Sequence, residues 1–466
     1  MNKKKLLISL LAATALSSCG GGSATPSTTS TPSGTSGQDT SSGEKQTVDL
    51  TVWAGETDEA YHYLEEVSNA FKKANTDFNY NFTIKAVSES SVNGDWAADA
   101  AKAADFAIAA DDQIPSMIKS NLIASLESLD RAIPGLSEDI RSRNSEESVE
   151  MVRDSDKTWG FPVSASNGYI LYYNSDYITE EDTASFDTLL AAIKRASDRD
   201  GKTYRFGFPY NSGWYLDGWF HGAGFSATGN AGEAKVTCDW NGTVNGVAGK
   251  DVAGALVKLA HGQYENYWTS QDQSMLMTQI GTDSSSPVIA TINGTWNYSR
   301  IKSSWGEKAC ATSLPSYHAD LSNKDFAMQS VKGFKIGIVN AKRTKTVRHA
   351  ARFAEFLTNY ENQILRFNKL SEAPTNKKAA ADIDVNTNPA VKALNEQWKK
   401  GAFIEKVNET FWNPSNSLST LLCNGGNKGE YNYITSGRGT ADIVIDYDAI
   451  QTQLDNTVKQ LSGQQN

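Results

Sequence analysis

Aromatic and acidic side chains stand directly after stretches of the chain that are predicted to be buried strands. Trp53 lies near the end of the apolar stretch 48–55, and Trp296 follows the apolar stretch 288–292 across an Asn-Gly pair typical of turns. Indole rings combine an apolar body with a polar N–H, a combination that binding clefts use. These positions predict a ligand site, with packing in the core as the alternative for each single aromatic.

Two more predicted strands, 105–110 and 204–208, are followed by side chains of the same types. In open α/β sheets, ligands bind beyond the carboxyl ends of the strands. Side chains at several strand ends would therefore face one cleft, because loop positions are usually exposed. The candidates at these strand ends are Trp53, Glu56, Asp58, Asp111, Asp112, Gln113, Trp214, Tyr215 and Trp296.

The sequence lacks the motifs of the common enzyme classes. It contains no GxSxG, HExxH, P-loop or paired CxxC pattern, and no two of its 5 histidines stand at metal-ligand spacing. We therefore expect no catalytic residues, no metal and no cofactor. Carboxylates are numerous, however, and a glycosidase needs only two of them at a set separation. A secreted glycoside hydrolase is thus kept as an alternative function.

The length and the charge of the chain narrow its class. With 466 residues it is too long for one hydrophobic core, so we expect two domains. The formal net charge is -10, and no long basic run follows residue 5. This distribution argues against nucleic acid as a partner. The charge favours solubility, and we expect a monomer.

The N-terminus has the pattern of an export signal. Lysines at positions 3–5 precede the apolar segment 6–16, which is too short to span a membrane. The following Leu-Ser-Ser-Cys ends at Cys19 and resembles the bacterial lipobox, whose cysteine is acylated and becomes the first residue of the mature protein. Two acyl chains suffice for stable anchoring. We expect residues 1–18 to be a lipoprotein signal peptide; the alternative is an ordinary signal with a chance cysteine.

Residues 19–47 follow as a stretch rich in Gly, Ser, Thr and Pro, with almost no apolar side chains. Such a composition cannot bury a core. It predicts a flexible tether with a reach of roughly 30 Å. The folded part would then be extracytoplasmic and attached to the cell membrane through the lipid anchor only.

The remaining cysteines are Cys238, Cys310 and Cys423. No pair has metal-ligand or CxxC spacing. Because disulfides persist outside the cytoplasm, we predict a bond between Cys238 and Cys310. Cys423 is expected to be a small buried apolar residue.

Predicted strands and helices alternate along the first part of the chain. Strand 48–55 precedes a helix whose apolar residues recur at helical spacing from Ala60 to Phe71, and strand 81–87 comes next. This alternation predicts an open, mostly parallel α/β sheet. A second α/β unit begins near Ser164.

Longer stretches from residue 48 to near residue 425 carry a resemblance to a known family. In chain order they include "LTVWAG", "DFAIAADDQIPSMIKSNLIASLE", "TWGFPVSASNGYILYYNSDYI", "ATINGTWNYSRI", "CATSLPS", "VKGFKIGIVNAKRTKTVRHAARFAEFLT" and "ETFWNP". In their order and spacing they resemble family 1 solute-binding proteins of bacterial ABC importers, the family of maltodextrin-binding protein. The resemblance implies a periplasmic-binding-protein-like α/β fold, with two α/β lobes joined by a hinge and a ligand cleft between them.

The resemblance also implies where the lobes divide. Lobe I would comprise residues 48–163 with 317–357, and lobe II residues 164–316 with 358–466. The hinge crossings would then lie near residues 163–166, 313–316 and 357–361.

Individual site residues follow from the matched motifs. The family's tryptophan after Asn-Gly matches Trp296, and the late Phe-Trp pair places a second sugar-stacking platform at Trp412. The acidic residue of the first-lobe loop matches Asp112. Where the family has an arginine after it, this chain has Gln113, and Asn167 replaces an acidic residue at the hinge. A further platform in that loop is replaced by alanine, so the sugar specificity should differ.

The expected function is capture of a sugar for import. Pyranose rings have apolar faces that stack on indoles, and their hydroxyls need partners such as Asp, Asn and Gln. We expect an oligosaccharide such as maltose or maltodextrin, delivered to the permease subunits of an ABC transporter. A secreted glycoside hydrolase and a surface carbohydrate adhesin without a transport role are the alternatives.

Overall fold

The computed structural model describes residues 45–209, 211–230, 233–269, 273–280, 287–425 and 430–464. The predicted signal peptide, the predicted lipidation site Cys19 and nearly all of the predicted tether lie outside the described residues. No helix in the described part of the chain is long and apolar enough to cross a membrane.

The first lobe is built on a five-stranded sheet with the strand order β2-β1-β3-β19-β6. β1 runs parallel to β2 and β3, whereas β19 is antiparallel to both of its neighbours. Alternate side chains of β1 are buried, among them Leu50 and Val52, as expected for a strand that contributes one face to a core. The strands are β1 (Thr47–Ala54), β2 (Asn79–Ala86), β3 (Phe106–Ala110), β6 (Phe161–Asn167) and β19 (Gly333–Val339).

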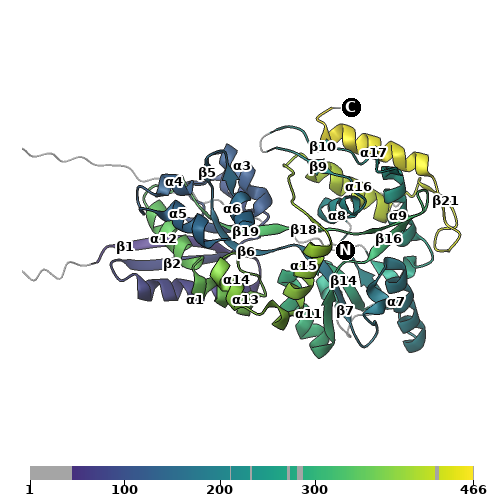
Figure 1. Cartoon of the computed structure of the whole chain (residues 1–466), viewed down its shortest axis with the longest axis horizontal. Helices are drawn as coiled ribbons and strands as arrows, with labels where there is room; N and C mark the ends of the chain where they lie inside the picture. The colour runs from purple at the N-terminus through teal and green to yellow at the C-terminus, as the bar shows by residue number, and fades with distance from the viewer. Residues whose placement is uncertain are drawn as a thin grey trace, which may run out of the picture. The chain divides into compact units, whose positions relative to one another are not determined.

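Helices pack on this sheet through apolar faces that the sequence spacing predicts. α1 (Asp58–Ala74) buries Leu64, Val67 and Phe71, and Thr57 caps it by accepting a hydrogen bond from the backbone of Ala60. Figure 1 shows β1, β2 and β19 together with α1, α12 and α13. The remaining helices of this lobe are α2 (Val92–Ala98), α3 (Ile114–Lys119), α4 (Leu126–Leu129), α5 (Leu136–Arg143), α6 (Glu146–Glu150), α12 (Val347–Leu357), α13 (Tyr360–Leu370) and α14 (Lys377–Asp382).

The second lobe is built on another five-stranded sheet, with the order β13-β8-β14-β7-β15. β14 is parallel to β8 and antiparallel to β7. All side chains of β14 are buried, which fits a central strand covered on both faces. The strands are β7 (Tyr169–Asn174), β8 (Arg205–Gly207), β13 (Trp268–Thr269), β14 (Val288–Gly294) and β15 (Ala309–Thr312).

The second sheet is covered by helices from two separate parts of the sequence, and Figure 1 shows β7 and β14 together with α7, α11 and α15. The helices before β19 are α7 (Phe186–Asp200), α8 (Gly213–Gly222), α9 (Gly249–His261), α10 (Gln273–Gln279) and α11 (Tyr298–Trp305). Those from the C-terminal part are α15 (Pro389–Lys400), α16 (Trp412–Asn424) and α17 (Tyr447–Leu461). The chain therefore returns to the second lobe after completing the first.

The chain passes between the sheets at places that differ in part from the expected hinge. The first passage lies between β6 and β7, close to the predicted residues 163–166. The predicted crossing at 313–316 lies inside the second lobe, because Leu314 N donates to Gln397 Oε1 on α15. The chain enters the first sheet only after β18 (Ser330–Val331), where β19 begins.

The third passage also comes later than predicted. Residues 357–361 join α12 to α13, and both helices contact α1 in the first lobe. The next helix that contacts the second sheet is α15, which packs on β7 and β15. Because α14 packs on α13, the return to the second lobe lies between α14 and α15.

The predicted disulfide is wrong, because Cys238 and Cys310 are both free. Cys238 lies in β10 (Thr237–Cys238), which pairs only with the short strand β9 (Ala227–Thr228). Cys310 lies in β15, where its partner across the sheet is Tyr173. The two thiols thus sit on separate elements with their own packing partners. Cys423 is buried in the core of the second lobe, as predicted.

Candidate functional site

A cavity of about 430 Å³ is lined by side chains of both lobes. The first lobe contributes the segments that follow β1, β2 and β3, together with the ends of β6 and α13. The second lobe contributes the start of α8, the turn after β14 and the segment before α16. The lining residues are Gly55, Glu56, Thr57, Glu59, Ala60, Ser88, Glu89, Ser90, Ala110, Asp112, Gln113, Asn167, Ser212, Trp214, Trp296, Ser299, Lys335, Leu370, Glu372, Glu405 and Trp412.

The second-lobe wall of the cavity is aromatic. It contains Trp214, Trp296 and Trp412, each at or next to the start of a helix. The rings of Trp214 and Trp296 lie with their centroids 5.9 Å apart and their planes at 35°. Ser212 fixes the start of α8 by accepting a hydrogen bond from the backbone of Trp214. The wall therefore offers apolar ring faces held at the ends of rigid elements.

The position of Trp296 depends on Gly294. A Cβ atom at residue 294 would lie 2.1 Å from the Cη2 atom of the Trp296 ring. Gly294 has a φ of -76°, so its backbone conformation does not require glycine. The reason for glycine here is the indole that lies over it, and the Asn-Gly pair belongs to the end of β14 rather than to a glycine-specific turn.

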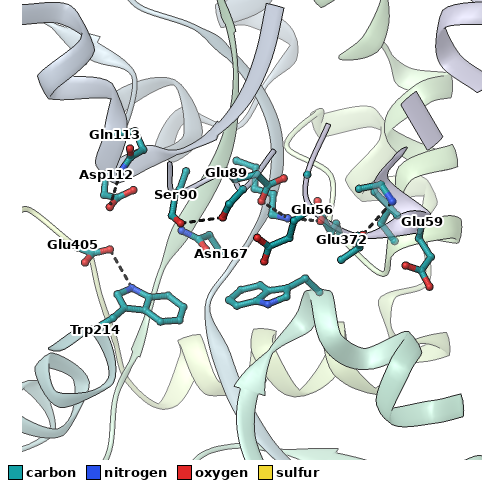
Figure 2. Close-up of a pocket in the computed structure, with 18 of the residues that line it drawn as sticks. Glu56, Glu59, Glu89, Ser90, Asp112, Gln113, Asn167, Trp214, Glu372 and Glu405 are labelled. Carbon is teal, nitrogen blue, oxygen red and sulfur yellow. Dashed lines mark hydrogen bonds and ion pairs between the residues drawn. The ribbon is translucent and has the colours of Figure 1, made fainter. Parts of the chain in front are cut away.

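The first-lobe wall of the cavity is polar and carries most of the charge. Its acidic residues are Glu56, Glu59, Glu89, Asp112 and Glu372. Figure 2 shows these carboxylates distributed along the cavity, with Glu59 at the end opposite to Glu405 and Trp214. A ligand in this cavity would therefore meet hydrogen-bond acceptors on one side and indole faces on the other.

Two of these carboxylates belong to a buried ion cluster. Lys335 Nζ lies 2.7 Å from Glu89 Oε2 and 2.7 Å from Glu372 Oε1. Arg366 Nε lies 2.7 Å from Glu372 Oε2. Burial alone would raise the pKa of Glu372, but Arg366 and Lys335 hold that pKa at about 2. Lys335 Nζ also lies 5.9 Å from the Trp296 ring, so the cluster supports the indole through a cation–π contact.

Asp112 and Glu405 form a second group, which does not include Lys335, the one cation among the described lining residues. Burial raises the pKa of Asp112 to about 6. Burial, followed by the charges of Asp112 and Asp111, raises the pKa of Glu405 well above its ordinary value. Trp214 Nε1 donates to Glu405 Oε2 at 3.1 Å, and Figure 2 shows this bond at the edge of the cavity. These carboxyl groups are therefore desolvated and close to one another.

One oxygen atom of each of these groups is buried without a hydrogen-bond partner: Oδ1 of Asp112 and Oε1 of Glu405. An unsatisfied buried acceptor costs free energy, and most buried polar atoms in proteins are paired. Both atoms belong to side chains that line the cavity. They are two acceptors on the lining that have no partner among the residues that this structure describes.

The comparisons with known proteins agree with this geometry. A family model for bacterial extracellular solute-binding proteins matches residues 66–393. The chain belongs to this family. It is a family of binding proteins, and its members act outside the cytoplasm, which agrees with the location predicted from the sequence. No curated protein matches the chain by sequence.

The following solved structures have the same fold and are distant in sequence. A maltodextrin-binding protein from L. casei BL23 without ligand has a TM-score of 0.68 and 22% identity, over 89% of this chain and 99% of that one. The maltose/maltodextrin-binding domain from Bdellovibrio bacteriovorus bound to maltotriose has a TM-score of 0.68 and 16% identity, over 89% and 99%. The maltotriose-binding protein of Thermus thermophilus, bound with maltotriose, has a TM-score of 0.66 and 16% identity, over 89% and 99%. At these identities the likeness shows the fold, and the predicted two-lobed α/β class is confirmed.

Most of the predicted site residues of this solute-binding protein meet in the cavity. They come from the ends of β1, β3, β6 and β14 and from the starts of α8 and α16. The arrangement follows the rule that ligands bind at strand ends of open α/β sheets. The predicted residues that line the cavity are Glu56, Asp112, Gln113, Asn167, Trp214, Trp296 and Trp412.

Four predicted residues do not line the cavity. Trp53 packs against Trp96, with ring centroids 6.3 Å apart, and Tyr215 packs against Tyr169 at 4.7 Å. Asp58 is the exposed first residue of α1. Asp111 is buried behind the cavity and accepts hydrogen bonds from Phe334 N at 2.9 Å and Asn167 Nδ2 at 3.2 Å. Core packing, the alternative for each single aromatic, holds for Trp53 and Tyr215.

Several lining residues were not expected from the sequence. Lys335 stands alone as a charge within the apolar strand "GFKIGIV", a pattern that signals a buried ion pair. A buried lysine requires acidic partners, and these are Glu89 and Glu372. No local sequence pattern indicates that Glu405 is buried in the site. The groups around it, Trp214, Asp111 and Asp112, come from distant parts of the sequence.

Proposed function

We propose that this protein captures an oligosaccharide, a maltodextrin in the first instance, and delivers it to the permease of an ABC importer. The observation that carries the proposal is the pairing of three tryptophans on the second lobe with a row of carboxylates on the first, across one cavity. Sugars present apolar ring faces and hydroxyl edges, which suit indoles and carboxylates respectively. The relatives named above bind maltodextrin or maltotriose, which supports this class of ligand.

The ligand would hold the two lobes together. Ser116 Oγ on α3 donates to Glu409 Oε2 at 3.0 Å, so the lobes already touch beside the cavity. We propose that they close on the sugar by bending at the passages around residues 167–169, 331–333 and 383–388. Lobe I would then comprise residues 45–167 with 333–382, and lobe II residues 169–331 with 389–464. At the first passage, a Cβ on Gly168 would lie 2.5 Å from Val331 O, so two passages run in contact.

The folded part is proposed to remain tied to the membrane. Acylation of Cys19 would anchor the chain, and the tether would let a monomer reach a permease. We expect Cys19→Ala to abolish incorporation of labelled palmitate into the protein in cells. Incorporation that persists in this variant would contradict the lipoprotein assignment.

A ligand screen tests the binding function. Maltotriose, maltotetraose and oligosaccharides of other linkages are added to the protein while the melting temperature and the tryptophan fluorescence are recorded. A ligand that binds only the native state raises the melting temperature by mass action. A flat response across the panel would contradict sugar binding and favour an adhesin. Release of shorter sugars during the titration would favour a glycoside hydrolase.

A further inference from the structure

One end of the cavity is acidic and uncompensated. Glu405 and Asp112 face this end from different lobes, and the charges that act most on Glu405 are those of Asp112, Asp111 and Asp217. Among the described residues that line the cavity, Lys335 is the one basic side chain. Its ammonium group is already bound to Glu89 and Glu372. No cation on the described lining is left for the other carboxylates.

The free oxygens of this acidic end are held in place. Glu405 is 8% exposed, and its bond from Trp214 Nε1 to Oε2 leaves Oε1 buried and unpaired. Gln113 Nε2 donates to Asp112 Oδ2 at 3.2 Å, which leaves Asp112 Oδ1 unpaired. Figure 2 shows Asp112 and Glu405 at the same end of the cavity, above the Trp214 ring. These two unpaired oxygens belong to side chains that line the same end of the cavity.

An ammonium group satisfies this pair better than a hydroxyl does. A hydroxyl has one hydrogen to donate and brings no charge, whereas an ammonium group donates three and is positive. When a ligand excludes water, two carboxylates buried together repel each other unless a cation lies between them. The neighbouring indoles of Trp214 and Trp296 also attract a cation to their faces.

We propose that this end of the cavity binds the ammonium group of an amino sugar, so that the protein binds an oligosaccharide with at least one positively charged ring more tightly than a neutral oligosaccharide such as a maltodextrin. Asp112 Oδ1 and Glu405 Oε1 accept its hydrogen bonds, and the sugar ring stacks on the tryptophans. This inference rests on the proposed function and names the class of sugar.

The test compares sugars that differ only by the amine. Cellotriose and the glucosamine trisaccharide share the β-1,4 linkage, and the second carries an ammonium group where the first carries a hydroxyl. The N-acetylated trisaccharide keeps the nitrogen but removes the charge. Dissociation constants are measured by calorimetry at pH 7, with maltotriose as the neutral α-1,4 sugar.

We expect the glucosamine trisaccharide to bind at least about tenfold more tightly than cellotriose and its N-acetylated form, since hydrogen bonds between charged groups are the strong ones. Equal or tighter binding of the neutral sugars overturns the inference and leaves the proposed function standing. If maltotriose and both members of the pair fail to bind, the proposed function fails as well.

Matched variants locate the ammonium site. Glu405→Gln and Asp112→Asn keep the shape of the side chain and remove one charge, so each should abolish most of the preference for the amino sugar over the neutral sugar. Glu59→Gln removes one charge at the opposite end of the cavity and should leave the preference unchanged. An equal effect of all three variants would contradict a localised site.

Proton release supplies a readout independent of affinity. Burial raises the pKa of Asp112 to about 6 and that of Glu405 well above its ordinary value. A bound ammonium group favours the ionised carboxylates, so binding should release protons, whereas a neutral sugar should not. Calorimetry in two buffers with different ionisation enthalpies measures this release. Both Glu405→Gln and Asp112→Asn retain the other charged groups near this site, Asp111, Asp217 and Lys335. Proton release that persists in both variants would therefore contradict the assignment to Asp112 and Glu405.

Discussion

The ring of Trp296 lies so close over Gly294 that a Cβ atom at residue 294 would come within 2.1 Å of the ring. The contact explains why a buried strand ends in glycine next to an aromatic residue. The position of the Trp296 ring therefore depends on the absence of a side chain at residue 294.

Gly294→Ala should displace the Trp296 ring and weaken sugar binding by about tenfold. Trp296 is only partly buried, so its ring can move towards solvent and the melting temperature should change little. Gly94→Ala is the matched control, because a Cβ there meets no atom within 4 Å. Unchanged affinity in Gly294→Ala would show that the observed ring position is not needed for binding.

Removal of the tryptophans themselves tests the aromatic wall. Trp296→Ala and Trp412→Ala should each weaken binding of the ligand by at least about tenfold without unfolding the protein, because both rings line the cavity. Tyr298→Ala is the control: Tyr298 stacks near Tyr172 and does not line the cavity. Affinities within twofold of the wild type for both tryptophan variants would contradict the cavity assignment.

The buried ion cluster should be important for stability. Lys335→Met leaves Glu89 and Glu372 without their shared partner, and we expect a loss of about 3 to 5 kcal/mol in the free energy of unfolding. Lys369→Met removes an exposed partner of Glu66 and should cost about 1 kcal/mol or less. Denaturant unfolding of both variants measures the difference. Similar losses in the two would contradict a special role for the buried cluster.

The sequence predicts the framework of the site better than its electrostatics. Strand ends and helix starts follow from local periodicity and capping, so Trp296 and Asp112 could be placed at the cavity in advance. Residues paired across long distances in sequence could not: Lys335, Glu89 and Glu372 meet only after the chain has folded. For the same reason the disulfide was mispredicted, because cysteine spacing carries no information on which elements lie together.

The positions of the hinge could not be predicted from local sequence patterns either. The residues near 313–316 and 357–361 are typical connections in sequence, yet each connects elements of one lobe. The chain passes from the second lobe to the first between β18 and β19. β18 pairs with β20 (Ala402–Phe403), whereas β19 pairs with β3 and β6. Such non-local pairing is not encoded in a local pattern.

Two carboxyl groups in the cavity should have opposite effects on the pH dependence of stability. The pKa of Asp112 is raised from 3.8 to about 6, so its ionisation destabilises the folded state, and this cost appears as the pH rises from 3.8 through 6. Asp112→Asn should therefore be more stable than the wild type at pH 7.5, by on the order of 2 kcal/mol, and the gain should vanish near pH 3.8.

The pKa of Glu372 is lowered from 4.5 to about 2, so its stabilising effect is complete above pH 4.5 and is lost as the pH falls towards 2. Glu372→Gln should accordingly be less stable than the wild type at neutral pH, with a deficit that shrinks only below pH 4.5. Unfolding free energies of both variants between pH 3 and pH 7.5 measure these changes, and the same sign for both would contradict the assigned environments.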